Sequence, residues 1–237
     1  MPNDYFQFKE FTIYQDRCAM KVSTEACILG AWFAYQQIET KNTLDLGSGT
    51  GLLMLMLAQQ WQGYFHGIEI ESKAAGQLRE NIQQSKWVEK CTVIEGDVRN
   101  YASPVAYDFI ISNPPFYEKQ VSSNDPSINM ARHSSSLSLV ELIRAIESNL
   151  SITGSFGILL PSKRALAFEK MAEARSFCLI QKLEVRHSPV HGEFRTILHM
   201  GRKKVDHPKT SSLLIRDITG NYSDEFVQLM KAYYLNL

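Results

Sequence analysis

The sequence predicts an α/β fold in which a mostly parallel sheet carries helices on both faces. Three observations predict it: short apolar runs alternate with segments of helical periodicity, a Gly-rich turn joins the first run to a helix, and paired strands follow near the C-terminal end. Regular alternation of strand and helix favours parallel pairing, because each helix carries the chain back across the sheet. With 237 residues, 44% of them apolar, the chain is long enough for one such domain.

Five apolar runs bounded by Gly, Pro, Asn or Asp are expected to form buried parallel strands. They cover residues 43–47, 64–70, 91–96, 107–112 and 155–161. Two further runs between Cys178 and Gly201 flank a turn marked by Pro189 and Gly192, which predicts an antiparallel hairpin at one sheet edge. The expected sheet therefore has seven strands, and residues 212–215 could add one more.

Helical periodicity is expected in the segments between these strands. Thr24 and Ser72 are suitable N-caps, since their hydroxyl oxygens can accept from the first free backbone N–H groups of a helix. The expected helices cover residues 24–37, 51–60, 72–85, 137–150, 163–175 and 223–235. No internal repeat, low-complexity tract or Gly/Ser-rich linker interrupts this pattern, which indicates one domain.

Composition argues against several classes of protein. The longest apolar run, residues 28–35, is too short to span a bilayer, and the first ten residues do not resemble a signal peptide, so we expect a cytoplasmic protein. The four cysteines form no C-x-x-C pair. His187 and His191 are four residues apart, but their strand-turn-strand context does not put them on one helical face. No metal site is therefore expected.

Charge is distributed unevenly although the net charge is formally zero. Residues 1–159 hold 12 basic and 17 acidic side chains, whereas residues 160–216 hold 12 basic and 5 acidic ones. A basic region attached to an acidic body is typical of a protein that meets a polyanion with one face. A solvated charged face without a partner is equally consistent with this pattern.

The Gly-rich turn L-D-L-G-S-G-T-G indicates a cofactor site. Asp45 ends the first strand, and Gly47, Gly49 and Gly51 form the turn into the next helix. Glycine adopts positive φ and lets a ligand approach the backbone without a Cβ clash. Dinucleotide enzymes use the spacing G-x-G-x-x-G, whereas G-x-G-x-G behind an acidic residue is the pattern of turns that bind S-adenosylmethionine (SAM).

Two acidic residues at the ends of the next strands fit the same cofactor. Glu69 follows the second strand, where its two carboxylate oxygens can accept from both hydroxyls of a ribose. Asp97 follows the third strand and can accept from the adenine amino group, with Val98 against the ring. Either residue alone could serve as a turn or a cap, but together they indicate a nucleoside site.

Residues Asn113-Pro114-Pro115-Phe116 follow the fourth strand and match the N-P-P-aromatic motif of methyltransferases that act on amino groups conjugated to a ring or carbonyl. Such nitrogens gain positive charge as they attack a methyl group. The side-chain oxygen of Asn113 and the carbonyl of Pro114 can accept from the two N–H bonds and stabilise that charge. Phe116 offers an aromatic face on which a splayed-out base can stack.

Several segments together resemble the bacterial tRNA1(Val) (adenine-37-N6)-methyltransferases. The resemblance is carried by D-R-C-A-M-K-V-S-T at 16–24, G-A-W at 30–32, the Gly-rich turn, I-S-N-P-P-F at 111–116 and N-Y-S-D-E-F near the C-terminus. It implies a Rossmann-like class I SAM methyltransferase that methylates N6 of adenine 37 in tRNA1(Val). It also implies that Met20, Lys21, Val22 and Thr24 lie over the methionine end of SAM.

The same resemblance implies how the chain is organised and what it binds. Residues 1–237 would form one methyltransferase domain, with a cofactor-covering segment at 1–40, a SAM-binding core at 41–201 and a C-terminal strand and helix at 202–237. The expected partner is the anticodon-loop region of tRNA, bound by a monomer or weak dimer. The basic residues themselves suggest candidate RNA contacts, namely Arg132, His133, Arg186, Arg195, Lys203 and Lys204. Arg132 and His133 could equally cap the helix that follows them.

Two alternative substrates remain open. Phe116 stands where adenine-N6 enzymes more often carry Tyr, and enzymes that methylate guanine N2 in ribosomal RNA often have Phe there. A protein glutamine-N5 methyltransferase would use the same motif on an amide, but it would have a helical recognition domain before the cofactor domain. Only about 40 residues precede the first strand here.

Overall fold

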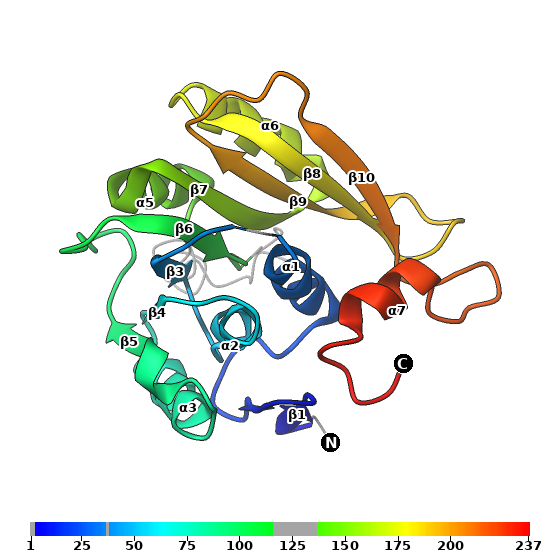
Figure 1. Ribbon diagram of the computed structural model, residues 1–237, viewed down its shortest axis with the longest axis horizontal. Helices are drawn as coiled ribbons and strands as arrows, with labels where there is room; N and C mark the ends of the chain where they lie inside the picture. The colour runs from blue at the N-terminus through cyan, green and yellow to red at the C-terminus, as the bar shows by residue number, and fades with distance from the viewer. Residues whose placement is uncertain (1–2, 37, 116–136) are drawn as a thin grey trace, which may run out of the picture.

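A twisted eight-stranded sheet forms the centre of the molecule (Figure 1). The computed structural model describes residues 3–36, 38–115 and 137–237. The strands follow the spatial order β10-β8-β9-β7-β6-β3-β4-β5. Because the chain returns from one side of β3 to the other between β5 and β6, the direction of winding reverses between β3 and β6, and ligands bind beside such reversals in open α/β sheets.

Five strands form the parallel half of the sheet. They are β3 (Asn42–Leu46), β4 (Tyr64–Glu69), β5 (Cys91–Glu95), β6 (Tyr107–Ser112) and β7 (Leu150–Pro161). Each pairs with its neighbour in parallel register, and the inner strands are buried on both faces, which explains why they read as continuous apolar runs. The alternating pattern predicted from the sequence is therefore confirmed for this half.

The other half contains the predicted hairpin. β8 (Cys178–Arg186) and β9 (Glu193–Gly201) pair in antiparallel register, and β9 also pairs antiparallel with β7. The additional strand foreseen near residue 212 is β10 (Lys209–Leu214), which runs parallel to β8 on its outer side. The sheet therefore has one strand more than the seven expected, and β10 rather than the hairpin occupies the edge.

Helices cover both faces of the sheet, as Figure 1 shows for α1 and α2 on one side and α5 and α6 on the other. The first face carries α1 (Thr24–Ala34), α2 (Leu52–Ala58), α3 (Ser72–Gln83) and α7 (Asp224–Met230). The second carries α5 (Leu139–Asn149) and α6 (Ser162–Glu173). No helix within the described ranges is both long and apolar enough to cross a bilayer.

The helices begin within two residues of the positions expected from the sequence, but both expected N-caps are displaced by one residue. Ser72 is the first residue of α3, and Glu71 occupies the cap position without a side-chain hydrogen bond. Ser23 rather than Thr24 caps α1, where its hydroxyl accepts from the N–H of Ala26. Ser138 and Glu141 form a capping box at the start of α5. A short antiparallel pair, β1 (Tyr5–Gln7) with β2 (Thr12–Tyr14), and a 3₁₀ turn at Val88–Lys90 had no strong sequence signal.

Close packing between α1 and the sheet depends on a glycine in β7. A Cβ atom at Gly157 would fall within the van der Waals radius of the buried Phe33 ring, so the ring would have to move. We expect Gly157→Ala to lower the free energy of unfolding by about 1–3 kcal/mol, as overpacking does. Urea denaturation checks this.

The matched control is Gly76→Ala in α3, where a Cβ meets nothing within 4 Å. Because alanine is favoured over glycine in helices, this change should stabilise the chain by up to about 1 kcal/mol. Equal stability of the two variants would contradict the packing described for Gly157.

Candidate active site

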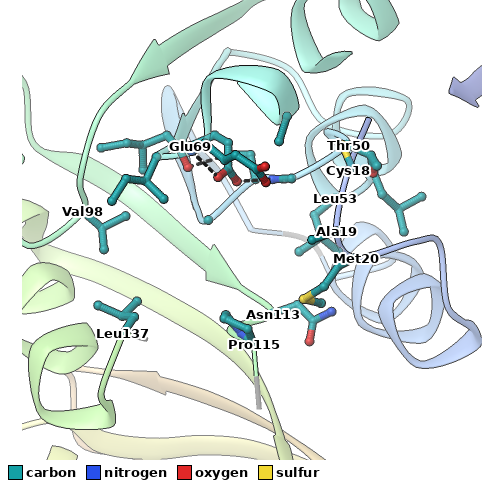
Figure 2. A pocket seen from close by; sticks show the side chains of 18 of the residues that line it. Cys18, Ala19, Met20, Thr50, Leu53, Glu69, Val98, Asn113, Pro115 and Leu137 are labelled. Atoms are coloured by element: carbon teal, nitrogen blue, oxygen red, sulfur yellow. Dashed lines mark hydrogen bonds between the residues drawn. The ribbon is translucent and has the colours of Figure 1, made fainter. Parts of the chain in front are cut away.

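A cavity of about 440 Å³ opens at the carboxyl ends of β3, β4 and β6, within the size range of small-molecule and cofactor sites. Figure 2 shows Glu69 and Val98 on one side of it, Met20 and Ala19 on another, and Asn113 with Pro115 across from Glu69. Of the residues predicted to form the site, Met20, Lys21, Val22, Gly47, Gly49, Glu69, Asp97, Val98 and Asn113 line this cavity. Segments far apart in the sequence therefore meet in one place.

The Gly-rich turn forms the floor between β3 and α2. Gly47, Gly49 and Gly51 all have positive φ, at 76°, 52° and 83°. A Cβ at Gly47 or Gly49 would meet nothing within 4 Å, so these two positions leave open space at the cavity. Gly51 does not line the cavity, because Leu78 of α3 packs where its Cβ would be. Its role in the structure is to let α3 approach the turn.

Glu69 is held in one orientation by the backbone around it. Its Oε2 accepts from the N–H of Gly49 and its Oε1 from the N–H of Glu71, both at 2.9 Å. The bond from Gly49 links the end of β4 to the Gly-rich turn, and the bond from Glu71 fixes the carboxylate to the segment after β4. Because each carboxylate oxygen has a second lone pair, both remain able to accept from a vicinal diol.

Asp97 forms hydrogen bonds and an ion pair with Arg99, a residue that the sequence did not point to. The Arg99 Nε donates to both carboxylate oxygens at 3.0 and 2.8 Å, its NH2 group lies 2.6 Å from Oδ2, and its backbone N–H donates to Oδ1 at 2.9 Å. The hydrogen bonds from the Arg99 side chain hold the pKa of Asp97 below its ordinary value. Asp97 is therefore an ionised acceptor at neutral pH.

Arg99 also lines the cavity and reaches Glu141 at 3.8 Å, which connects the end of β5 to the start of α5. An arginine two residues after an acidic strand end has no specific sequence signature, so only the fold reveals this connection. Leu137, just before the cap of α5, lines the same wall.

Asp45 lies behind the turn rather than in the cavity wall. Only 1% of its surface is exposed, and neither carboxyl oxygen has a hydrogen-bond partner among the described residues. Burial, and to a lesser extent the charge of Glu69, raise the pKa of Asp45 to about 8. The carboxyl is therefore mostly neutral at pH 7, which avoids the large cost of an isolated buried charge.

The N-P-P turn follows β6 directly. Ser112 donates from Oγ to the carbonyl of Leu46 at 2.8 Å, which ties the end of β6 to the end of β3. Asn113 is half-buried and lines the cavity together with Pro115, whereas Pro114 is buried. Phe116, Arg132 and His133 lie outside the described residues.

The N-terminal segment forms the wall opposite the sheet. Residues 18–22 all line the cavity, including Cys18 and Ala19, which the sequence analysis did not name. Lys21 donates from Nζ to the carbonyl of Asn3 at 3.3 Å. Thr24 begins α1 and does not line the cavity, whereas Ala26, in the first turn of the same helix, does.

The candidate RNA-binding residues do not share one place. Arg186 ends β8 and Arg195 lies beside Pro161 at the carboxyl end of β7, so both occupy the edge that carries the cavity. Arg186 pairs with Glu193 at 2.7 Å and Arg195 with Glu25 at 3.8 Å. Lys203 and Lys204 follow the far end of β9, roughly 25 Å away at about 3.3 Å per residue.

The described residues contain no group of three or more His, Cys, Asp or Glu side chains that could hold a metal ion. The site observations fit SAM instead. The turn leaves room for a ligand, Glu69 keeps free lone pairs, and Asp97 is ionised. A nucleoside with an attached amino acid is the class of ligand that such donors and acceptors suit.

Comparisons with known proteins agree with this geometry. A family model described as "Methyltransferase small domain" matches residues 27–140. Among solved structures, a predicted O-methyltransferase from Agrobacterium tumefaciens has a TM-score of 0.67 at 15% identity and covers 90% of this chain and 99% of its own. P. horikoshii TYW2 in complex with MeSAdo has a TM-score of 0.61 at 14% identity, covering 86% of this chain and 74% of its own. The fold is that of the class I SAM-dependent methyltransferases.

Curated relatives match over the full length. The tRNA1(Val) (adenine(37)-N6)-methyltransferase of Bacteroides fragilis is 35% identical over 240 residues, which cover 100% of both chains. The protein of the same name from Dyadobacter fermentans is 37% identical over 237 residues, which cover 98% of each chain. At this identity and coverage, the chain belongs to the tRNA1(Val) (adenine(37)-N6)-methyltransferase family.

Proposed function

We propose that this protein transfers a methyl group from SAM to N6 of adenine 37 in tRNA1(Val), acting on the anticodon loop in the cytoplasm. The observation that carries the proposal is that Asn113 and Pro115, on either side of the buried Pro114, line the same cavity as Glu69 and the Gly-rich turn. An amino-group methyltransferase needs its acceptors for the target nitrogen beside the cofactor site, because the reacting atoms must meet in line.

The cofactor side of the cavity binds and orients SAM, which supplies an electrophilic methyl group when bound. Glu69 accepts from the ribose hydroxyls, and its two backbone hydrogen bonds keep its oxygens in place for them. Asp97 accepts from the adenine amino group, with Val98 against the ring. Met20, Lys21 and Val22 cover the methionine end.

The substrate side stabilises the target nitrogen. The Asn113 side-chain oxygen and the Pro114 carbonyl accept from the two N–H bonds of the adenine amino group, which favours the lone pair that attacks the methyl carbon. The two prolines fix φ at consecutive positions and keep these acceptors rigid. The nitrogen would bond to the methyl carbon as the carbon–sulfur bond of SAM breaks, which leaves S-adenosylhomocysteine. Its extra proton would pass to solvent only afterwards, so the site requires no strong base. Phe116, outside the described residues, would stack on the base.

The whole chain, residues 1–237, would act as one methyltransferase domain, as a monomer or weak dimer. Arg186 and Arg195 are the candidate phosphate contacts that occupy the cavity edge. Arg132 and His133 remain candidates outside the described residues. Lys203 and Lys204 lie at the opposite edge, which makes them weaker candidates for a contact with the RNA.

Replacing Asn113 should separate chemistry from cofactor binding. We expect Asn113→Ala to lower kcat at least tenfold while the Kd for SAM stays within about twofold, because the side chain acts on the target nitrogen rather than on SAM. Steady-state kinetics on tRNA and calorimetric titration with SAM measure the two quantities. Glu69→Ala should do the reverse and weaken SAM binding first.

The paired control is Glu95→Ala. Glu95 lies beside Glu69 in the sheet register but pairs with Arg79 outside the cavity, so its loss should leave SAM binding unchanged. Loss of SAM binding in Asn113→Ala, or unchanged binding in Glu69→Ala, would overturn the division of roles proposed here.

Removing a charge at the cavity edge should weaken tRNA binding. We expect Arg195→Ala to reduce the slope of log K against log salt by about 1, because one phosphate contact and its released counterion are lost. Lys204→Ala, at the other end of β9, should leave that slope nearly unchanged. Filter binding at several salt concentrations measures both, and salt-independent binding of the unmodified protein would mean that the basic region is only a solvated face.

A further inference from the structure

Two polar side chains on α3 are buried although neither lines the cavity. Gln77 and Asn81 lie one helical turn apart, and each is only 1% exposed. Burying an amide group is costly unless its donors and acceptors find partners. The hydrogen-bond partners of these two residues therefore show which backbone segments α3 holds in place.

Asn81 binds two backbone segments at once. Its Oδ1 accepts from the N–H of Tyr14 at 3.0 Å, and its Nδ2 donates to the Tyr14 carbonyl at 2.9 Å. The same Nδ2 donates to the carbonyl of Thr50, in the Gly-rich turn, at 2.9 Å. Asn81 thus fixes the distance between the turn and the chain that leads into the N-terminal wall.

Gln77 holds the next part of that chain. Its Oε1 accepts from the N–H of Arg17 at 2.8 Å, directly before residues 18–22, which line the cavity. Those five residues are called the cover below. At the other end of the cover, the N–H of Val22 donates to Oε1 of Gln15, itself 4% exposed, at 2.8 Å. Both ends of the cover are therefore anchored by buried amides.

The same helix face also supports the floor of the cavity. Leu78, adjacent to Gln77, packs against Gly51 in the position that a side chain would otherwise fill. α3 consequently contacts the floor and holds the cover, and both border the same cavity (Figure 2 shows Thr50 beside the cover residues Cys18, Ala19 and Met20).

We propose that Gln77 and Asn81 are positioning residues for SAM binding, which set the height of the cover above the Gly-rich turn. The inference rests on the proposed function, because it takes this cavity as the SAM site. Without either amide the cover loses an anchor and SAM dissociates faster. Neither residue reaches the reacting atoms, so kcat at saturating SAM should change little.

The test compares variants of the full chain by calorimetric titration with SAM and by steady-state kinetics on tRNA. Gln77→Met keeps the length of the side chain but removes the acceptor for Arg17, whereas Gln77→Glu retains an acceptor oxygen. We expect Gln77→Met and Asn81→Leu to raise the Kd and KM for SAM at least fivefold with kcat within about twofold. Gln77→Glu should stay within about twofold of the unmodified protein in all three.

A matched control separates positioning from general loss of stability. Asn149 is 2% exposed and likewise makes three hydrogen bonds, accepting from Ser103 N–H and donating to the carbonyls of Tyr101 and Ala145, but it does not contact the cover. Asn149→Leu should therefore destabilise the fold without changing the Kd for SAM. If Asn81→Leu does not fold, the Gln77 pair still decides the matter.

Three results would overturn the inference. The first is unchanged SAM affinity in Gln77→Met. The other two are a loss of SAM affinity in Gln77→Glu, or in Asn149→Leu, as large as the loss in Gln77→Met. Glu69→Ala distinguishes failure of the positioning role from failure of the proposed SAM site. If Glu69→Ala weakens SAM binding but Gln77→Met does not, only the positioning role is wrong. If Glu69→Ala leaves SAM binding unchanged, the cavity is not the SAM site, and the proposed site and this inference are both wrong.

Discussion

Parallel pairing of β3 with β4 and β6 is the constraint on which the site depends. Each of these strands ends at the same edge, and the residues after them are therefore neighbours although up to 66 residues separate them, as the bond from Ser112 Oγ to the Leu46 carbonyl illustrates. The cavity sits where the winding reverses beside β3, so one edge receives the Gly-rich turn, Glu69 and the N-P-P turn. A sheet in antiparallel register would distribute these residues between two edges.

The three acidic side chains at the site differ in their partners and in their charge. Glu69 and Asp97 accept hydrogen bonds that fix their oxygens, and Asp97 is further held in its charged form by Arg99. Asp45 has no such partner, and burial keeps its carboxyl largely neutral at pH 7. The cavity thus presents ordered acceptors without placing three full negative charges against one another.

Much of the fold could be predicted from the sequence because buried parallel strands and the Gly-rich turn leave strong local patterns. The same holds for Glu69 and Asn113, since a residue directly after a strand must lie at the sheet edge. The partners of these residues could not be predicted, because they depend on which helix packs where. Arg99, and the anchoring amides Gln77 and Asn81, look in the sequence like polar residues of a solvated surface.

The positions of the basic residues also could not be predicted from the sequence. Arg195 and Lys204 belong to one basic stretch of sequence, yet Arg195 lies near the start of β9 and Lys204 follows its far end, so most of the length of the strand separates them. Likewise, Gly51 reads as part of the cofactor turn, but its missing side chain makes room for Leu78. A residue's neighbours in the sequence therefore indicate what kind of contact it can make, but not where in the fold that contact lies.

The central claim is that the Asn113 turn presents adenine N6 of tRNA to SAM. Transfer of labelled methyl from SAM by the purified protein to tRNA, ribosomal RNA and protein from a strain lacking the gene, followed by nucleoside and amino-acid analysis, tests it most directly. We expect N6-methyladenosine at position 37 of tRNA1(Val). Label found instead in N2-methylguanosine of ribosomal RNA, or in protein glutamine, would contradict the assigned substrate.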